Sequence, residues 1–199
     1  MGLKLEYADG QTPLSEEEKD GLKLRGVTTH GELNEQEQLN IEDALLWLYA
    51  LRIKPSRLLS EVFLKELHKR MFNNVWVWAG QYRKSEKNIG VNCYRIHVEV
   101  KNLLDDLKYW IEKEVFPPDE ICLRFKHRLV SIHCFPNGNG RHSRLMADVL
   151  REKLFFKKPF GWRQSEIHKP NQVRSRYIMA LKAADSGNIE PLLNFARAV

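Results

Sequence analysis

The chain has 199 residues, the length of one domain with a small appendage. Hydrophobic residues make up 43% of it and charged residues 29%, which supplies a substantial core and excludes wholesale disorder. The formal net charge of +6 is compatible with anionic partners but identifies none.

Apolar runs are short throughout, and none approaches the roughly 20 residues that a membrane helix requires. The start of the chain lacks the apolar stretch that marks a secretory signal. Cys93, Cys122 and Cys134 form no CxxC pair, and an odd number of cysteines cannot all pair within one monomer. We therefore expect a protein without a membrane span, kept in the reducing cytoplasm.

The first 33 residues are polar and interrupted by glycine and proline. Within them, Ser15 and Glu18 have the spacing of a capping box and predict a short helix. A first long helix is expected to begin near Asn34, because apolar residues recur at helical spacing after it. We accordingly divide the chain into an N-terminal segment, residues 1–33, and a main domain, residues 34–199.

The middle of the chain changes its periodicity twice. From Leu59 to Met71 every fourth residue is apolar, which predicts a second helix. Within residues 75–98, apolar and polar residues alternate with a change of phase near Cys93, which favours an irregular β-hairpin. Helical spacing returns after Leu103 and continues, with short breaks, to the end. The sequence therefore predicts one all-α, mainly helical domain with a small β-hairpin.

The segment from His133 to Arg144 joins two of these predicted helices through a short loop. Gly138 and Gly140 flank Asn139, and glycine allows positive φ and a close approach of ligand to backbone. The loop runs into a helix N-terminus, where free N–H groups and the helix dipole favour an anion. A tight connector would explain the glycines alone, but not the flanking histidine and arginines. We therefore expect an anion-binding cradle.

Arg141 and Arg144 lie in the first turns of the second helix, where a cation is electrostatically unfavourable. Their position indicates that an anion pairs with them, and a polyphosphate is the natural candidate. His133, at the other side of the loop, is placed to take a proton from a hydroxyl nucleophile. Bound phosphate and the helix dipole raise its pKa, whereas the two arginines lower it, so the sequence leaves its charge open.

The same segment resembles the signature of the Fic (filamentation-induced-by-cAMP) family, His-Pro-Phe-x-Asp/Glu-Gly-Asn-Gly-Arg-x-x-Arg. The matching positions are His133, Phe135, Gly138, Asn139, Gly140, Arg141 and Arg144. Residues 78–83 look like the family's approach to a β-hairpin flap, and residues 177–193 resemble its C-terminal helices. In length and loop sequence the chain is most similar to the small bacterial proteins called mobile mystery protein B.

The resemblance implies a protein adenylyltransferase, which transfers AMP from ATP to a Ser, Thr or Tyr hydroxyl of a target protein. It makes His133 the general base and Phe135 the anchor of the loop in the core. The implied nucleotide-binding residues are Asn137, Gly138, Asn139, Gly140, Arg141, Arg144 and Tyr177. Among these, Arg144 would hold the γ-phosphate, and Tyr177 would either edge the adenine pocket or pack in the core.

Asn137 replaces the Asp or Glu that coordinates Mg²⁺ in the family. An amide oxygen is a neutral ligand, and Mg²⁺ is usually held by carboxylates and phosphates. The resemblance thus implies ATP and Mg²⁺ but only a weak metal site at Asn137, and transfer of a different phosphate-containing group stays open. Cys134 replaces the family's proline, which we expect to affect only the stiffness of the loop.

The flap of the family holds the target segment by edge pairing. Carried over to this sequence, that role falls to Lys84, Ser85, Lys87, Asn88 and Ile89. The alternative is an ordinary exposed hairpin, which is polar because it is solvated.

Many members of the family carry an inhibitory motif, Ser/Thr-x-x-x-Glu-Gly/Asn, whose glutamate pairs with the second arginine and blocks the γ-phosphate site. The stretch from Thr28 to Glu32 fits its first five positions, although Leu33 replaces the last one. The alternative is that Glu32 serves the entrance of the following helix.

Two other functions compete with transfer. A nucleotide- or protein-binding module without catalysis is favoured by Asn137. DNA binding through the helix–loop–helix would use Arg141, Arg144 and Arg151, and it ranks last because it leaves His133 unexplained. The expected partners are therefore ATP and a target protein rather than nucleic acid or a membrane, and a homo-oligomer stays open.

Overall fold

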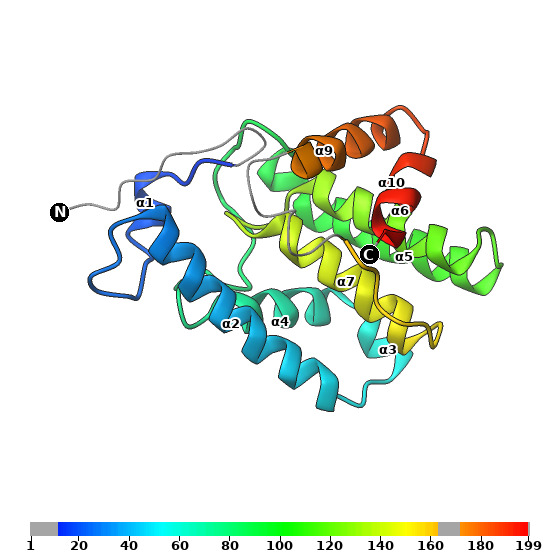
Figure 1. The fold of residues 1–199 in the computed structure, drawn as a ribbon, viewed down its shortest axis with the longest axis horizontal. Helices are drawn as coiled ribbons and strands as arrows, with labels where there is room; N and C mark the ends of the chain where they lie inside the picture. Colours follow the sequence, from blue (N-terminus) through cyan, green and yellow to red (C-terminus); the bar gives the residue numbers. More distant parts are fainter. Residues whose placement is uncertain (1–11, 163–171, 199) are drawn as a thin grey trace.

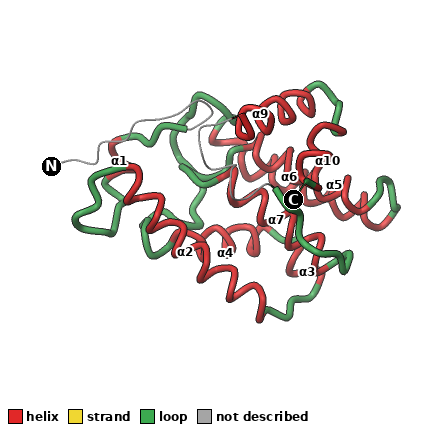
Figure 2. The backbone as a smooth tube through the Cα atoms, viewed as in Figure 1, coloured by secondary structure: helices red, strands yellow, loops and turns green. Residues whose placement is uncertain are grey.

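The computed structural model describes residues 12–162 and 172–198. This described part consists of helices and loops, red and green in Figure 2, and contains no strand. The helices are α1 (Glu16–Lys19), α2 (His30–Ala50), α3 (Pro55–Leu58), α4 (Glu61–Phe72), α5 (Ile96–Glu112), α6 (Pro118–Ile132), α7 (Asn139–Lys153), α9 (Gln172–Asp185) and α10 (Glu190–Arg197). The predicted mainly helical fold class is confirmed.

α6 and α7 form the centre of the bundle (Figure 1). α6 packs against α5, α7 and α10, while α7 also contacts α4, which in turn packs against α2. Phe125, Leu129 and Ile132 of α6 are buried, as their helical spacing predicts. Residues 133–138, which connect the two central helices, are therefore held at both ends by buried elements.

The first long helix begins at His30 rather than near Asn34. Thr29 is its N-cap, because Thr29 Oγ1 accepts the N–H of Glu32 and the Glu32 carboxylate accepts the N–H of Thr29. This capping box is complete one turn before the predicted start, so the cap at Asn34 is not needed. As a result, α2 runs across the predicted boundary at residue 33.

The β-hairpin predicted within residues 75–98 is not formed. Residues 81–92, which we call the flap loop, have no regular secondary structure. The guanidinium of Arg83 donates to the carbonyl oxygens of Ser85 and Val91, groups that a hairpin would need for cross-strand pairing. One side chain therefore bonds two carbonyl groups of this loop, in place of a second strand.

The N-terminal segment lies beside the flap loop. Ser15 Oγ accepts the N–H of Glu18, and the Glu18 carboxylate accepts the N–H of Ser15, so the predicted capping box of α1 is confirmed. Leu22 forms an isolated antiparallel bridge with Trp76, shortly before the flap loop begins. These contacts hold α1 against the chain that leads into the flap loop.

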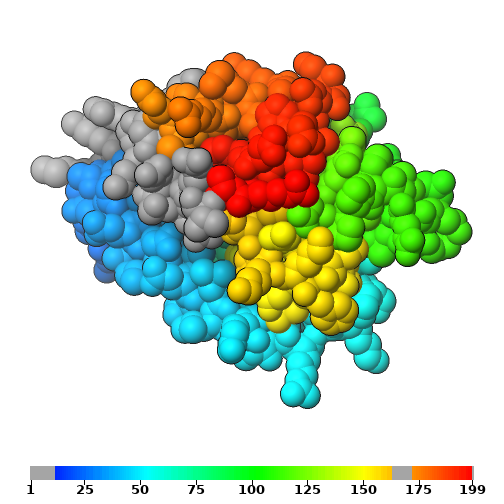
Figure 3. Space-filling view, turned by 45° about the vertical axis from the view of Figure 1, so that its right-hand side comes forward, coloured from blue at the N-terminus to red at the C-terminus, as the bar shows by residue number. Residues whose placement is uncertain are grey.

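The C-terminal helix closes the bundle on another side. In Figure 3, α10 is red and lies against the yellow segment that follows α7. The N–H groups of Gly161 and Trp162 donate to the carbonyl of Ala196 at 3.0 and 3.3 Å.

None of the described helices is long and apolar enough to cross a membrane.

Candidate active site

The loop between α6 and α7 begins and ends on a residue with positive φ. His133 is the C-cap of α6 with φ 57°, and Gly138 is the N-cap of α7 with φ 78°. A left-handed residue ends a helix and turns the chain away from its axis. Glycine adopts this conformation freely, whereas histidine does so rarely, and such residues cluster at functional sites. Among the four non-glycine residues with positive φ in the described part of the chain, His133 is the one that lies in this loop.

The side chain of Asn139 fixes the shape of this loop. Its Oδ1 accepts the N–H of Phe135 at 2.9 Å, and its Nδ2 donates to the Phe135 carbonyl at 2.8 Å. The Phe135 ring is 1% exposed and stacks on His68, with 3.7 Å between the ring centroids. Phe135 thus anchors the loop in the core, as the resemblance implied.

The two glycines of the loop differ. A Cβ on Gly138 would lie 2.6 Å from ring carbons of Phe72, so both its φ and its surroundings require glycine. Gly140 has no positive φ; it lies in the first turn of α7, and a Cβ there would come no closer than 3.9 Å to Arg144 Nη1. The expectation that both glycines supply positive φ holds for Gly138 alone.

His68, which the sequence analysis did not single out, ties this loop to the beginning of the flap loop. Its Nδ1 accepts the N–H of Gly80 at 3.0 Å, and its Nε2 donates to the Asn137 carbonyl at 3.1 Å. The ring is fully buried, and burial holds its pKa well below the ordinary value, so the neutral form keeps both bonds. A lone histidine in a helix gives no sequence signal of such a role.

The N-terminus of α7 has no side-chain cap. The N–H groups of Asn139, Gly140 and Arg141 have no hydrogen-bond acceptor among the described residues. Together with the positive end of the helix dipole, they form a site for an anion. The donors that the predicted cradle requires are therefore free of other acceptors in the described part of the chain.

The two arginines of the motif have different surroundings. Arg141 Nη2 pairs with Glu37 Oε2 at 2.6 Å, and Glu37 also accepts a hydrogen bond from Trp76 Nε1 at 2.6 Å. Arg144 has no carboxylate partner among the described residues. We expected both cations to await an anion; Glu37, a buried residue of α2, already neutralises one of them. A contact across 104 residues could not be inferred from either local sequence.

Arg144 lies beside a second cation in the interior. Its guanidinium carbon is 5.6 Å from the centroid of the Tyr177 ring, and Lys126 Nζ is 4.6 Å from the same centroid. Lys126 is fully buried, and its ammonium has no hydrogen-bond partner among the described residues. Tyr177 is 7% exposed and also packs on Phe195, so its contacts favour the core-packing alternative over the edge of an adenine pocket.

Glu32 caps α2. Its carboxylate accepts hydrogen bonds from the N–H of Thr28 at 2.8 Å and of Thr29 at 3.0 Å. These bonds, the one from Thr28 first, lower the pKa of Glu32. The structure thus has the capping alternative, and the pairing of Glu32 with Arg144 that inhibition would need is not formed among the described residues.

The ring of His133 is neutral at pH 7. The residue is 5% exposed, and neither ring nitrogen has a hydrogen-bond partner among the described residues. Its pKa is lowered to about 4, first by burial and then by the neighbouring Arg83 and Lys87. We expected the arginines of the motif to lower this pKa, but the cations that do so belong to the flap loop. A general base must be unprotonated, and His133 meets this requirement.

The flap loop packs directly on the backbone of His133. Arg83 Nε donates to the His133 carbonyl at 2.7 Å, and the N–H of Val91 donates to the Ile132 carbonyl at 3.2 Å. Gly90 has φ 101°, and a Cβ there would lie 2.6 Å from the Cβ of His133. Glycine is therefore required where the flap loop crosses the histidine.

The flap-loop residues predicted to dock a target face in two directions. Lys84, Asn88 and Ile89 are exposed. Ser85 and Lys87 instead turn toward α1, where both contact the Glu18 carboxylate.

The residues at the loop do not fit a Mg²⁺ site. Asn137 Oδ1, the predicted ligand, accepts the N–H of Gly138 at 2.5 Å. Among the described residues no group of three His, Cys, Asp or Glu side chains is close enough together to hold a metal ion. The nearby Glu37 carboxylate is already bonded to Trp76 and Arg141. The chain itself therefore offers magnesium no set of charged ligands here.

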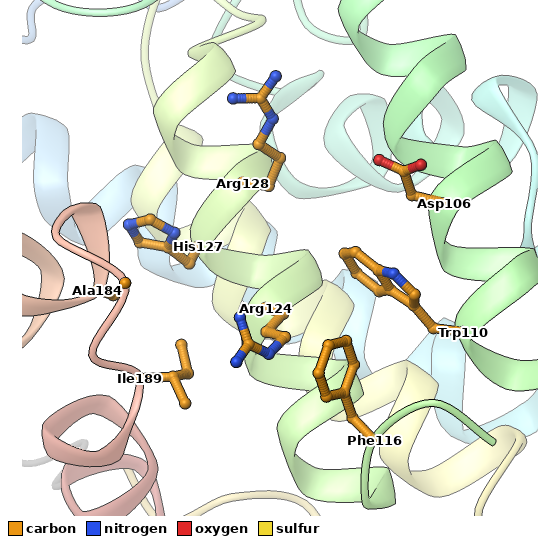
Figure 4. Close-up of a pocket in the computed structure, with 9 residues that line it drawn as sticks. Asp106, Trp110, Phe116, Arg124, His127, Arg128, Ala184 and Ile189 are labelled. Carbon is orange, nitrogen blue, oxygen red and sulfur yellow. The ribbon is translucent and has the colours of Figure 1, made fainter.

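A cavity of about 230 Å³ lies away from this loop, between α5, α6 and the turn that joins α9 to α10 (Figure 4). The two arginines that line it are already paired, Arg124 with Glu120 and Arg128 with Glu99. It therefore lacks the free positive charge that characterises the α6–α7 loop.

Comparison with known proteins agrees with the motif and the fold. Curated relatives named Protein adenylyltransferase Fic include one from Aedes aegypti, 24% identical over 86% of this chain and 32% of its own length. Another, from Drosophila virilis, is 28% identical over 68% of this chain and 28% of its own length. The chain thus spans about a third of the length of these relatives.

Solved structures share the fold. Fic-1 from C. elegans superposes with a TM-score of 0.67 at 21% identity, over 89% of this chain and 51% of that one. A second structure is the N-terminal Fic domain of a putative cell filamentation protein from Bartonella quintana, solved with bound ADP. It superposes with a TM-score of 0.66 at 17% identity, over 87% of this chain and 86% of that one. Residues 58–150 match the model of the Fic/DOC family. Over this stretch, a little under half of its length, the chain is similar to the Fic/DOC family.

Proposed function

We propose that this protein is a protein adenylyltransferase that moves AMP from ATP to a Ser, Thr or Tyr hydroxyl of a target protein. One observation carries the proposal: three features meet at a single short loop. They are a helix N-terminus without a side-chain cap, an arginine without a carboxylate partner and a neutral histidine without a hydrogen-bond partner, in each case among the residues that the structure describes. The curated relatives, which are named protein adenylyltransferases, support it.

In this proposal the triphosphate of ATP lies at the N-terminus of α7, where the free N–H groups and the helix dipole stabilise negative charge. Arg144 pairs with the outer phosphate, and the nitrogens of Arg141 that Glu37 leaves free bind a second one. His133 accepts the proton of the target hydroxyl while its oxygen bonds to the α-phosphorus. The bond from that phosphorus to the bridging oxygen breaks, and pyrophosphate leaves.

The target segment would pair with the flap loop. The backbone N–H groups from Lys84 to Gly90 have no acceptor among the described residues, which leaves an edge for an added extended segment. Exposed Lys84, Asn88 and Ile89 supply side-chain contacts to it. The reducing cytoplasm is the compartment we propose, and the three cysteines are free thiols.

Transfer is tested by incubating the purified protein with ATP labelled in its α-phosphate and a cell lysate. We expect labelled protein with the unaltered chain and at least a hundredfold less with His133→Ala, because removal of a general base costs on the order of 10²–10⁴ in rate. His97→Ala is the control, since that side chain is 67% exposed and lies outside the loop. Mass spectrometry of the product identifies the transferred group. Undiminished labelling with His133→Ala would refute the assigned base.

A nucleotide-binding module without transfer is the second candidate, and the poor fit to Mg²⁺ favours it. It predicts calorimetric binding of ATP that is the same with magnesium and with a chelator, and no labelled product. Labelled product that depends on His133 excludes this candidate.

A further inference from the structure

The flap loop is tied to the N-terminal segment through one carboxylate. Glu18 Oε1 accepts a hydrogen bond from Ser85 Oγ at 3.0 Å, and Glu18 Oε2 pairs with Lys87 Nζ. The exposed fractions are 11% for the Glu18 side chain and 5% for that of Lys87. Both side chains are therefore largely buried. Loss of one charge from a buried ion pair costs more stability than loss of one from an exposed pair.

Backbone groups of the same segment support this contact. Lys87 Nζ also donates to the Pro13 carbonyl at 2.9 Å, and Trp78 Nε1 donates to the Glu18 carbonyl at 3.0 Å. Lys87 thus receives both of its acceptors from residues that precede α2. Residues 12–22 hold the flap loop from one side.

On its other side the same loop covers the histidine of the site. Gly90 packs on the Cβ of His133, and the His133 side chain is buried without a hydrogen-bond partner among the described residues. A target hydroxyl must reach that ring, so the loop has to move away from it. Ser85 and Lys87, which we expect to contact the target, are already occupied by Glu18.

We propose that Glu18 is an intramolecular latch, which holds the flap loop over His133 and competes with the target for Ser85 and Lys87. That opening of the flap loop allows catalysis rests on the function proposed above. The contact of Glu18 with the flap loop does not depend on that function. Glu18 acts on the loop rather than on the nucleotide cradle, and the target gains access when the N-terminal segment releases Lys87.

The latch is tested with Glu18→Gln. Glutamine at this position still completes the capping box with Ser15, so α1 is retained while the charge facing Lys87 is lost. Glu16→Gln is the matched control: it lies in the same helix, its side chain is 88% exposed, and its partner is Lys19.

Two measurements detect opening of the flap loop and do not depend on AMP transfer. One is hydrogen exchange of peptides covering residues 83–92, and the other is the rate at which diethyl pyrocarbonate modifies His133. We expect both to rise roughly tenfold in Glu18→Gln, as for loss of one partner of a mostly buried ion pair, and to stay unchanged in Glu16→Gln. Equal rates in Glu18→Gln and the unaltered protein would overturn the latch.

Charge reversal gives a second, independent arm. Glu18→Lys should open the flap loop, and Glu18→Lys combined with Lys87→Glu should bring hydrogen exchange back toward that of the unaltered protein. A double variant that exchanges as fast as the single one overturns the pairing as the cause. In the lysate assay, faster labelling with Glu18→Gln supports both proposals, whereas opening without any labelling supports the latch and counts against the transferase.

Discussion

Gly138 and Gly140 stand two residues apart in the loop, yet only Gly138 is under steric constraint. Gly138→Ala places a side chain at φ 78° and 2.6 Å from the Phe72 ring. We expect it to lower the free energy of unfolding by roughly 2–3 kcal/mol and to weaken ATP binding, because left-handed strain and overpacking add.

Gly140→Ala is the matched control for this prediction. The residue is helical and a Cβ there comes no closer than 3.9 Å to Arg144 Nη1, so alanine should raise the free energy of unfolding by up to about 1 kcal/mol. Urea denaturation of the two variants measures both values. Equal destabilisation by the two substitutions would mean that the loop geometry is wrong.

The burial of His133 predicts a dependence of stability on pH. The pKa of His133 is about 4 in the folded protein and 6.5 in the reference state, so the unfolded chain binds the proton first as the pH falls. The stability that comes from keeping this ring neutral is present above pH 6.5 and is lost toward pH 4. We expect the free energy of unfolding to fall more steeply between these values in the unaltered protein than in His133→Gln. Identical slopes would show that the ring is not buried.

At the scale of the elements, Asp119 joins three parts of the chain. From the first turn of α6 it pairs with Arg151 of α7 at 3.1 Å, with Lys157 at 3.3 Å and with Arg197 of α10 at 3.1 Å. These cations, with Arg151 the first of them, outweigh the effect of burial and lower the pKa of the carboxyl. Asp119 thus holds the C-terminal helix on the central pair.

Asp119→Asn should cost about 2 kcal/mol of stability and speed hydrogen exchange in α10, because the buried carboxylate that pairs with three cations loses its charge. Asp105→Asn provides the comparison: Asp105 also pairs with two lysines but lies exposed on α5, where such pairs contribute little. If α10 exchanges at the same rate in both variants, the ion cluster does not hold it.

The helices could be predicted because their signals are local. In α4 and α6, apolar residues recur within each segment and face the core of the bundle. The beginning of α2 was missed because two adequate caps, Thr29 and Asn34, lie only five residues apart. The flap loop was mistaken for a hairpin because it is held by distant partners, which alternation cannot reveal. The Arg83 side chain bonds carbonyls within the loop, and the N–H groups of Arg83 and Val91 bond the carbonyls of Cys134 and Ile132.

At the scale of the whole molecule, the motif could be predicted but its electrostatics could not. His133 to Arg144 are contiguous in sequence, so their chemistry could be inferred from one segment. The groups that decide their charges come from elsewhere: Glu37 from α2, and Arg83 and Lys87 from the flap loop. The bundle brings these elements to the ends of α6 and α7 (Figure 1).

The central claim is that the N-terminus of α7 holds the phosphates of a nucleotide. A titration of ¹⁵N-labelled protein with ATP, followed by NMR, tests it most directly. We expect the largest amide shifts at Asn139, Gly140 and Arg141, and we expect Arg144→Ala to weaken ATP binding by tenfold or more. Saturable ATP binding that leaves these three amides unmoved would contradict it.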